Sequence, residues 1–173
     1  DKEILEAHSE GIICLSGCVS SEFNRTILRG EDHFDQAAEV AKWFHGIFGD
    51  RYYIEIMNNG VDIQKIALEG SVDIANRLGL PLVATSDCHY VDPEDAEAQD
   101  VMLCINTGKF RTDTNRMRMD GHQYFLRSQE EMYNKFPGLD DAVARSQEIA
   151  NSVDIEIELG QRHFPVYEGP PEQ

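Results

Sequence analysis

The feature that most constrains the fold is a regular alternation of short β-type runs with longer helical segments. The β-type runs are Gly11–Leu15, Arg51–Met57 and Leu80–Thr85. Apolar residues at helical spacing follow the first two runs and predict helices over 32–48 and 63–78. After the third run, Asp92-Pro93 is an N-cap with proline at the first helical position, which predicts a helix over 92–108 that ends at Gly108. Because the order is β-α-β-α-β-α with short connections, we expect parallel strands joined by right-handed crossovers. The sequence therefore predicts an α/β fold.

Beyond residue 108 the chain is predicted to be mostly helical. We expect a solvated basic loop at 109–121, a short strand at 124–126 and a helix that starts with a capping box at 128–131. A further helix is expected at 140–153 and an exposed linker at 164–173.

The composition restricts what this chain can bind by itself. Asp and Glu number 32 against 15 Lys and Arg, which gives a net charge of −17. Such a surface repels phosphate backbones, so we expect no nonspecific duplex binding by this chain alone, and a metal site or a basic protein partner fits better. The cysteines show no paired spacing, and no run reaches the about 20 apolar residues of a membrane span. A reduced, cytoplasmic protein without membrane contact is expected.

The chain is also expected to be a fragment of a longer protein. It begins at Asp1-Lys2-Glu3 without a methionine, and three strands are too few to close a barrel. An incomplete barrel exposes strand edges, so we expect the isolated fragment to self-associate.

Chemically active side chains follow each predicted strand. Cys18 follows the first, Glu55 and Asn59 lie at the end of the second, and Asp87 and His89 come directly after the third. Since the carboxyl ends of parallel strands meet at one edge, these side chains are candidates for a common site. A thiolate, carboxylates and an imidazole together suit Zn²⁺ or, with more oxygen ligands, Mn²⁺ or Fe²⁺.

Each candidate also has a purely structural interpretation. Cys18 is compatible with a small buried residue, Asp87 with a turn cap and His89 with an ordinary polar contact. Glu55 could pair with an arginine or face solvent. An Asp-x-His pair alone is a weak motif, and its position directly after a buried strand strengthens it. Cys14 and Cys88 are expected to face the core.

Six segments, in this order, resemble the PHP (polymerase and histidinol phosphatase) region of bacterial DNA polymerase III alpha subunits. They are Leu15–Cys18, Tyr53–Ile56, Leu82–Tyr90, Pro93–Ile105, Asp120–Leu126 and Glu156–Gly160. The resemblance extends over nearly the whole chain and is most specific from Leu82 to Ile105.

This resemblance implies an architecture and a domain division. The fold is expected to be a partial (βα) barrel, a fragment of a distorted seven-stranded PHP barrel, followed by a mostly helical extension. Residues 1–108 are then the C-terminal βα units of the PHP domain. Residues 109–163 are its end and a helical connection towards the polymerase palm, and 164–173 are a linker.

The resemblance also implies metal ligands. Asp87 and His89 match the last metal motif of the family, and Cys18 matches a position that supplies a thiolate. The expected cofactors are divalent ions (Zn, Mn or Mg) in the complete domain. Relatives often carry histidine where this chain has Asn59, and further ligands of the family lie upstream of Asp1. The isolated chain is therefore expected to bind metal poorly and to be inactive.

The function implied is that of a part of a replicative DNA-directed DNA polymerase, whose PHP region is a metal-dependent phosphoesterase with 3′–5′ exonuclease activity. The alternative is a non-catalytic scaffold that stabilises the polymerase and docks the proofreading exonuclease subunit. A more distant alternative, an amidohydrolase-type barrel, explains only the Asp-x-His pair. The implied partners are DNA and dNTPs through the full polymerase, the proofreading subunit, the sliding clamp and other holoenzyme subunits.

Overall fold

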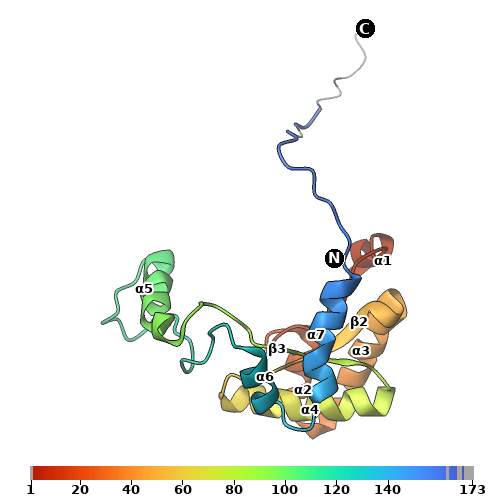
Figure 1. The fold of residues 1–173 in the computed structure, drawn as a ribbon, viewed down its shortest axis with the longest axis horizontal. Helices are drawn as coiled ribbons and strands as arrows, with labels where there is room; N and C mark the ends of the chain where they lie inside the picture. The colour runs from red at the N-terminus through yellow and green to blue at the C-terminus, as the bar shows by residue number, and fades with distance from the viewer. Residues whose placement is uncertain (1, 163, 167–168, 170–173) are drawn as a thin grey trace.

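The computed structural model describes residues 2–162, 164–166 and 169. Within them, the strands form a three-stranded parallel sheet in the order β1-β2-β3. Figure 1 labels β2 and β3 of this sheet among the helices. The strands are β1 (Cys14–Leu15), β2 (Tyr52–Met57) and β3 (Leu82–Thr85). The α-helices are α1 (Lys2–Ala7), α2 (Glu22–Ile27), α3 (Phe34–Phe48), α4 (Asp62–Leu78), α5 (Ala96–Thr107), α6 (Gln129–Lys135) and α7 (Asp140–Ser152). Short 3₁₀ turns are η1 (Glu31–His33), η2 (Gly49–Arg51) and η3 (Pro93–Asp95).

The predicted α/β class and the parallel strand order are confirmed, with two local differences. The first strand is shorter than expected because the carbonyls of Ser9 and Ile12 accept hydrogen bonds from the Arg51 side chain, at 2.6 and 2.7 Å. Helix α2 was not expected at all. Its signal is a serine N-cap, since the Ser21 hydroxyl accepts from the Asn24 N–H at 3.1 Å.

One face of the sheet carries the core. In β2 the buried side chains alternate with half-buried ones, and the buried set is Tyr52, Ile54 and Ile56. The first two pack in a cluster with α2, α3 and α4, and Ile56 packs in a second cluster with α6 and α7. Because residues two apart in a strand share a face, both groups of helices cover the same face of the sheet.

The opposite face of β2 carries the half-buried side chains Tyr53, Glu55 and Met57. This face bears the first acidic candidate of the site, Glu55. Helix α4 begins just beyond the end of β2 and ends at Gly79, whose φ of 67° lies in the left-handed region, as the sequence predicts.

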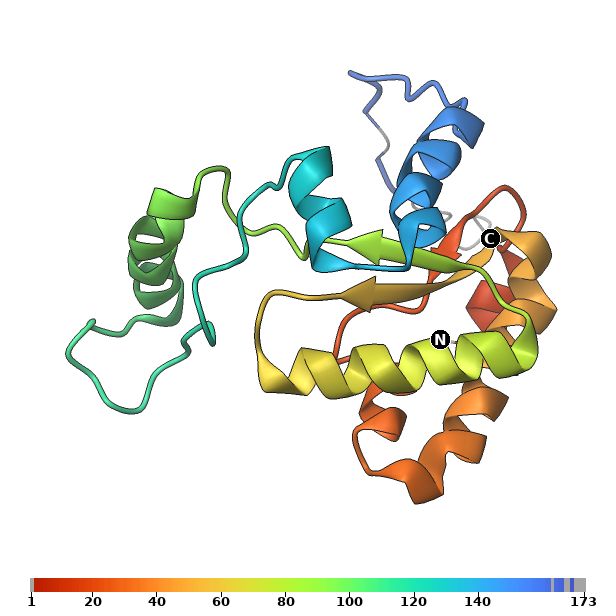
Figure 2. The ribbon, with the colours of Figure 1, turned by 60° about the horizontal axis from the view of Figure 1, so that its bottom comes forward.

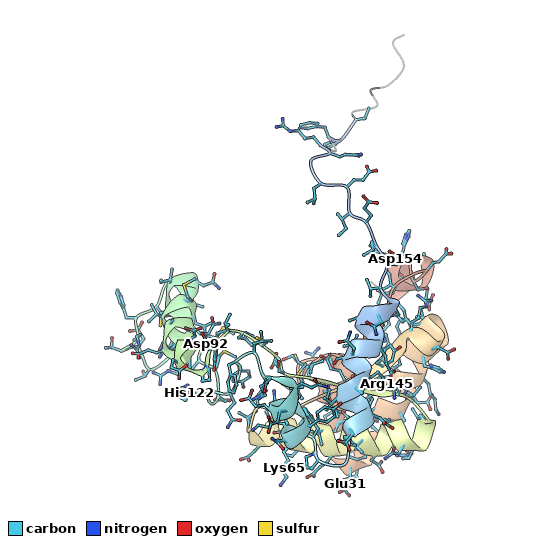
Figure 3. All side chains as sticks on the ribbon, viewed as in Figure 1. Glu31, Lys65, Asp92, His122, Arg145 and Asp154 are labelled. Carbon is cyan, nitrogen blue, oxygen red and sulfur yellow. The ribbon has the colours of Figure 1, made fainter. Side chains whose placement is uncertain are left out.

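The segment between β3 and α6 projects away from the sheet. Helix α5 and the loop after it stand apart from the other helices in both views (Figures 1 and 2). Asp92 and His122 lie in this projecting part, whereas Lys65 and Arg145 lie on the main body (Figure 3). Helix α5 is confirmed, preceded by the turn η3 and ended by Gly108.

The strand predicted at 124–126 is replaced by one isolated parallel bridge between Tyr90 and Phe125. This bridge joins the two ends of the projecting segment, so that α6 and α7 return to the sheet. Helix α7 then packs against β3 through Ala142, Val143 and Ala84. The predicted linker 164–173 falls largely outside the described residues. None of the described helices combines the length and apolar character needed to cross a membrane.

Candidate metal site at the carboxyl edge of the sheet

Asp87 and His89 lie side by side in the loop after β3. Oδ1 of Asp87 is 3.3 Å from Nε2 of His89, and both side chains are partly exposed. In a tetrahedral Zn²⁺ site two ligands at about 2.0–2.2 Å from the ion lie about 3.3–3.6 Å from each other. The separation and the oxygen–nitrogen donor chemistry therefore fit two ligands of one ion.

The backbone of this loop is held from the segment that returns from α5. The N–H of His89 donates to the carbonyl of Tyr124 at 2.7 Å, and the two rings meet edge to face with centroids 5.6 Å apart. Asp87 has a φ of 48°, which is unusual for a residue other than glycine and is maintained only where the surroundings hold it. The bridge between Tyr90 and Phe125 continues this support.

Glu55 lies on the half-buried face of β2 next to the end of β3. Its Oε1 accepts a hydrogen bond from the Thr85 hydroxyl at 2.7 Å. Burial raises the pKa of the Glu55 carboxyl, and the nearby charge of Asp87 adds to that shift. Hydrogen bonds from Thr85 and from the Gly17 backbone oppose it. Groups from the loop after β1, from β3 and from the loop after β3 therefore all influence the pKa of Glu55 in β2.

The loop that carries Cys18 is fixed by a buried amide. Asn24, in α2, donates to the carbonyls of Gly17 and Cys18 at 2.8 and 3.2 Å. Its Oδ1 accepts from the Ser71 hydroxyl of α4 at 3.1 Å. Cys18 and Glu55 both line a cavity of about 10 Å³, which holds about one water molecule.

A second buried network begins at Asn59, in the loop after β2. The Asn59 N–H donates to Oε1 of Gln64 at 2.6 Å, and Nε2 of Gln64 lies 3.5 Å from Oδ2 of Asp87. The Asn59 side chain accepts from Nη1 of Arg127 at 2.8 Å. Burial lowers the pKa of Arg127, whose guanidinium also donates to the carbonyl of Gln123 at 2.5 Å.

The structure brings together only part of the predicted ligand set. Asp87 and His89 form a pair, and Glu55 lies near Asp87, but Cys18 lines a small cavity that it shares with Glu55 and not with Asp87 or His89. Among the residues that the structure describes, no three Cys, His, Asp or Glu side chains gather closely enough to hold a metal ion. The assignment of Cys18, Asp87 and His89 as metal ligands thus stays a prediction.

Two expectations about individual side chains change. Cys88 does not face the core: it is exposed, and its thiol donates to the carbonyl of Tyr90 at 3.1 Å because the loop turns outward after Thr85. Asn59 is 1% exposed and serves as an internal hydrogen-bond partner.

Sequence reasoning missed Gln64, Asn24 and Arg127. The position of Gln64 in the first turn of a helix that follows a strand end is a signal that could have identified it. The other two carry no local signal.

Comparisons with known proteins point to one group of relatives. Residues 1–59 match the family model described as PHP domain. The chain is 40% identical over 154 residues to DNA polymerase III subunit alpha of Borreliella burgdorferi, covering 89% of this chain and 13% of that protein. The subunit of Treponema pallidum is 37% identical over 173 residues, covering 99% and 15%. That of Thermus aquaticus is 35% identical over 178 residues, covering 98% and 14%.

The chain thus spans about a seventh of the length of the curated relatives that it matches. The similarity runs through the strands, the candidate loops and the helices that follow them. The chain is thus similar to a part of the bacterial DNA polymerase III alpha subunits, and its residues 1–59 match the model of the PHP domain family.

Proposed function

We propose that this chain is a part of a replicative DNA polymerase III alpha subunit and that it contributes to a metal-dependent phosphoesterase site with 3′–5′ exonuclease activity. The observation that carries the proposal is the Asp87–His89 pair, 3.3 Å apart at the carboxyl edge of the sheet. It occurs in a chain similar to these subunits over most of its length.

The sheet is proposed to be a section of a (βα) barrel. Sequential strand order with right-handed crossovers places the crossover helices on one face, and the core clusters, in which α2, α3, α4, α6 and α7 cover one face of the sheet, support this arrangement. The half-buried face with Glu55 would then line the barrel interior. Residues 1–108 would be the last βα units of the PHP domain, and 109–163 its end and the connection towards the palm.

The roles of the side chains follow from their positions. Asp87 and His89 would bind a divalent ion (Zn, Mn or Mg), and Cys18 would bind from the first loop once further ligands complete the site. A divalent ion held there supplies an activated water and neutralises charge on the scissile phosphate. Glu55, whose pKa is raised by burial, is placed to hold or release a proton between the two loops.

The partners proposed for the complete protein follow from the same similarity. DNA and dNTPs would contact other regions of the polymerase, since this chain carries a net charge of −17. The proofreading subunit, the sliding clamp and other holoenzyme subunits would bind the assembled polymerase in the cytoplasm.

The proposal is tested on the whole polymerase that carries this chain. Bound metal is measured by elemental analysis in the wild type and in Asp87→Ala. Nuclease activity of the same two proteins is measured on 3′-labelled single-stranded DNA. The matched control is Asp154→Ala, because Asp154 is an exposed carboxylate beyond α7 (Figure 3). We expect Asp87→Ala to lose metal and nuclease activity while polymerase activity persists.

Two results would contradict the catalytic proposal. One is a wild-type protein without stoichiometric metal, and the other is unchanged nuclease activity in Asp87→Ala. Either result would favour the alternative, a non-catalytic scaffold. That alternative is tested by a pull-down of the proofreading subunit with the Asp87→Ala polymerase.

A further inference from the structure

Gln64 is a buried polar side chain that the proposed metal chemistry does not itself use. It lies in the first turn of α4 and is 3% exposed. Its amide has two distinct partners: Oε1 accepts from the Asn59 N–H at 2.6 Å, and Nε2 points to Oδ2 of Asp87 at 3.5 Å. One side chain therefore connects the loop after β2 with the loop after β3.

The two oxygens of Asp87 have different partners. Oδ2 lies towards Gln64, and Oδ1 lies towards Nε2 of His89. A carboxylate rotates freely about its terminal torsion unless neighbours distinguish its oxygens. The Gln64 amide supplies that distinction, because it donates to one oxygen and leaves the other directed towards the imidazole.

The anchor of Gln64 is itself rigid. Asn59, which donates its N–H to Gln64, is 1% exposed, and its side chain is bound by the buried guanidinium of Arg127. Arg127 is 8% exposed and reaches Asn59 from the segment that precedes α6. Two buried hydrogen bonds thus connect Arg127 through Asn59 to Gln64, and a part-buried one continues from Gln64 to Asp87.

We propose that Gln64 is a positioning residue of this site, which holds the Asp87 carboxylate so that Oδ1 and His89 Nε2 present a preformed pair of donors to a divalent cation. The part of this inference that concerns the cation rests on the proposed function. The part that concerns the loop does not, because the left-handed φ of Asp87 needs support whether or not an ion is bound.

The size of the effect follows from the behaviour of groups that orient metal ligands. Removing such a hydrogen-bond partner lowers metal affinity by about 10- to 100-fold. Gln64 donates to a proposed ligand without touching the cation, so the same range is expected here. The backbone of the Asp87 loop should also open more often, which is observable at the His89 amide, bonded to Tyr124 at 2.7 Å.

The experiment compares Gln64→Met with the wild type in the whole polymerase that carries this chain. Methionine keeps the length and apolar contacts of glutamine and removes both hydrogen bonds. Zn²⁺ alone is titrated by calorimetry, and hydrogen exchange of the His89 amide is measured without metal. The control is Thr26→Val, which removes a part-buried hydrogen bond, from the buried Thr26 Oγ1 to the Glu22 carbonyl, on a different helix.

We expect Gln64→Met to bind Zn²⁺ about 10- to 100-fold more weakly and to exchange the His89 amide faster, while Thr26→Val changes neither. Wild-type Zn²⁺ affinity in Gln64→Met overturns the proposal. If the wild-type chain binds no Zn²⁺, the proposed function fails, and the exchange of His89 alone decides the role of Gln64: unchanged exchange overturns it. If Gln64→Met does not fold, Gln64→Asn is measured in its place, because its side chain is one methylene shorter and its amide lies farther from Asp87. The same results support or overturn the proposal.

Discussion

Arg127 donates from Nη1 to Oδ1 of Asn59 over 2.8 Å, and both side chains are buried although 68 residues separate them. This bond joins the loop that follows β2 to the segment that returns from the projecting helix α5. It therefore ties the sheet to the part of the chain that leads into α6.

Replacing Arg127 by methionine should destabilise the fold. The change leaves Oδ1 of the buried Asn59 without a donor, which costs about 1–3 kcal/mol. Urea unfolding followed by circular dichroism measures the loss, and Arg29→Met, at an exposed arginine, should leave the midpoint nearly unchanged. If the bond carries the effect, the double variant Arg127→Met/Asn59→Leu should recover part of the loss; equal midpoints for Arg127→Met and the wild type would contradict this interpretation.

Two helical glycines should respond to alanine in opposite directions. A Cβ on Gly70, in α4, would lie 2.5 Å from Cγ2 of Ile27 and 3.1 Å from the Phe34 ring, whereas a Cβ on Gly46, in α3, meets nothing within 4 Å. We expect Gly70→Ala to cost about 1–3 kcal/mol through overpacking. Gly46→Ala should gain about 0.5–1 kcal/mol through helix propensity. Thermal unfolding of the two variants tests this pair, and a stabilising Gly70→Ala would show that α2 and α4 are not in close contact.

Glu55 should make stability fall as the pH rises. Burial raises the pKa of its carboxyl in the folded state above the unfolded value of about 4.3, so the folded chain binds more protons in the interval between the two values. Folding stability from this group is then greatest at low pH and decreases as the pH passes upward through the raised pKa. Glu55→Gln removes this loss and keeps an oxygen that can accept from Thr85.

The measurement for Glu55 is a series of urea midpoints between pH 4 and pH 7 in the wild type and Glu55→Gln. The advantage of the variant should grow with pH and then become constant. A difference between the two proteins that does not vary with pH would exclude a raised pKa at Glu55.

Asn24→Ala should release the loop that carries Cys18. The variant removes the bonds from Asn24 to the Gly17 and Cys18 carbonyls and the acceptor of Ser71. We expect the Cys18 thiol to react several-fold faster with a disulfide reagent, as resolved by peptide mass spectrometry. The exposed Cys88 is the internal control, with an unchanged rate. An unaltered Cys18 rate would show that Asn24 does not hold this loop.

Local pattern predicted much of the fold. The periodicity of 32–48 and 63–78 gave α3 and α4, and the glycines at 79 and 108 gave the ends of α4 and α5 through left-handed caps. The serine capping box at 128 gave the start of α6, with both of its hydrogen bonds present. These features depend on contacts within a few residues, which is why sequence spacing alone was sufficient.

The site was predicted less completely. The proximity of Asp87 and His89 follows from their spacing after a strand, but the separation of Cys18 from them depends on how Asn24 and Ser71 place the first loop. The exposure of Cys88 depends on the outward turn after Thr85.

The sequence by itself determined the order of the three strands with α3, α4 and α5, and the presence of a carboxylate and an imidazole after the third strand, because both depend on short-range spacing. Only the tertiary structure decided that Gln64 and Arg127 support this pair, that α5 projects and that α7 returns to cover β3. Those relationships join residues far apart in the chain, and burial, not local periodicity, selects them.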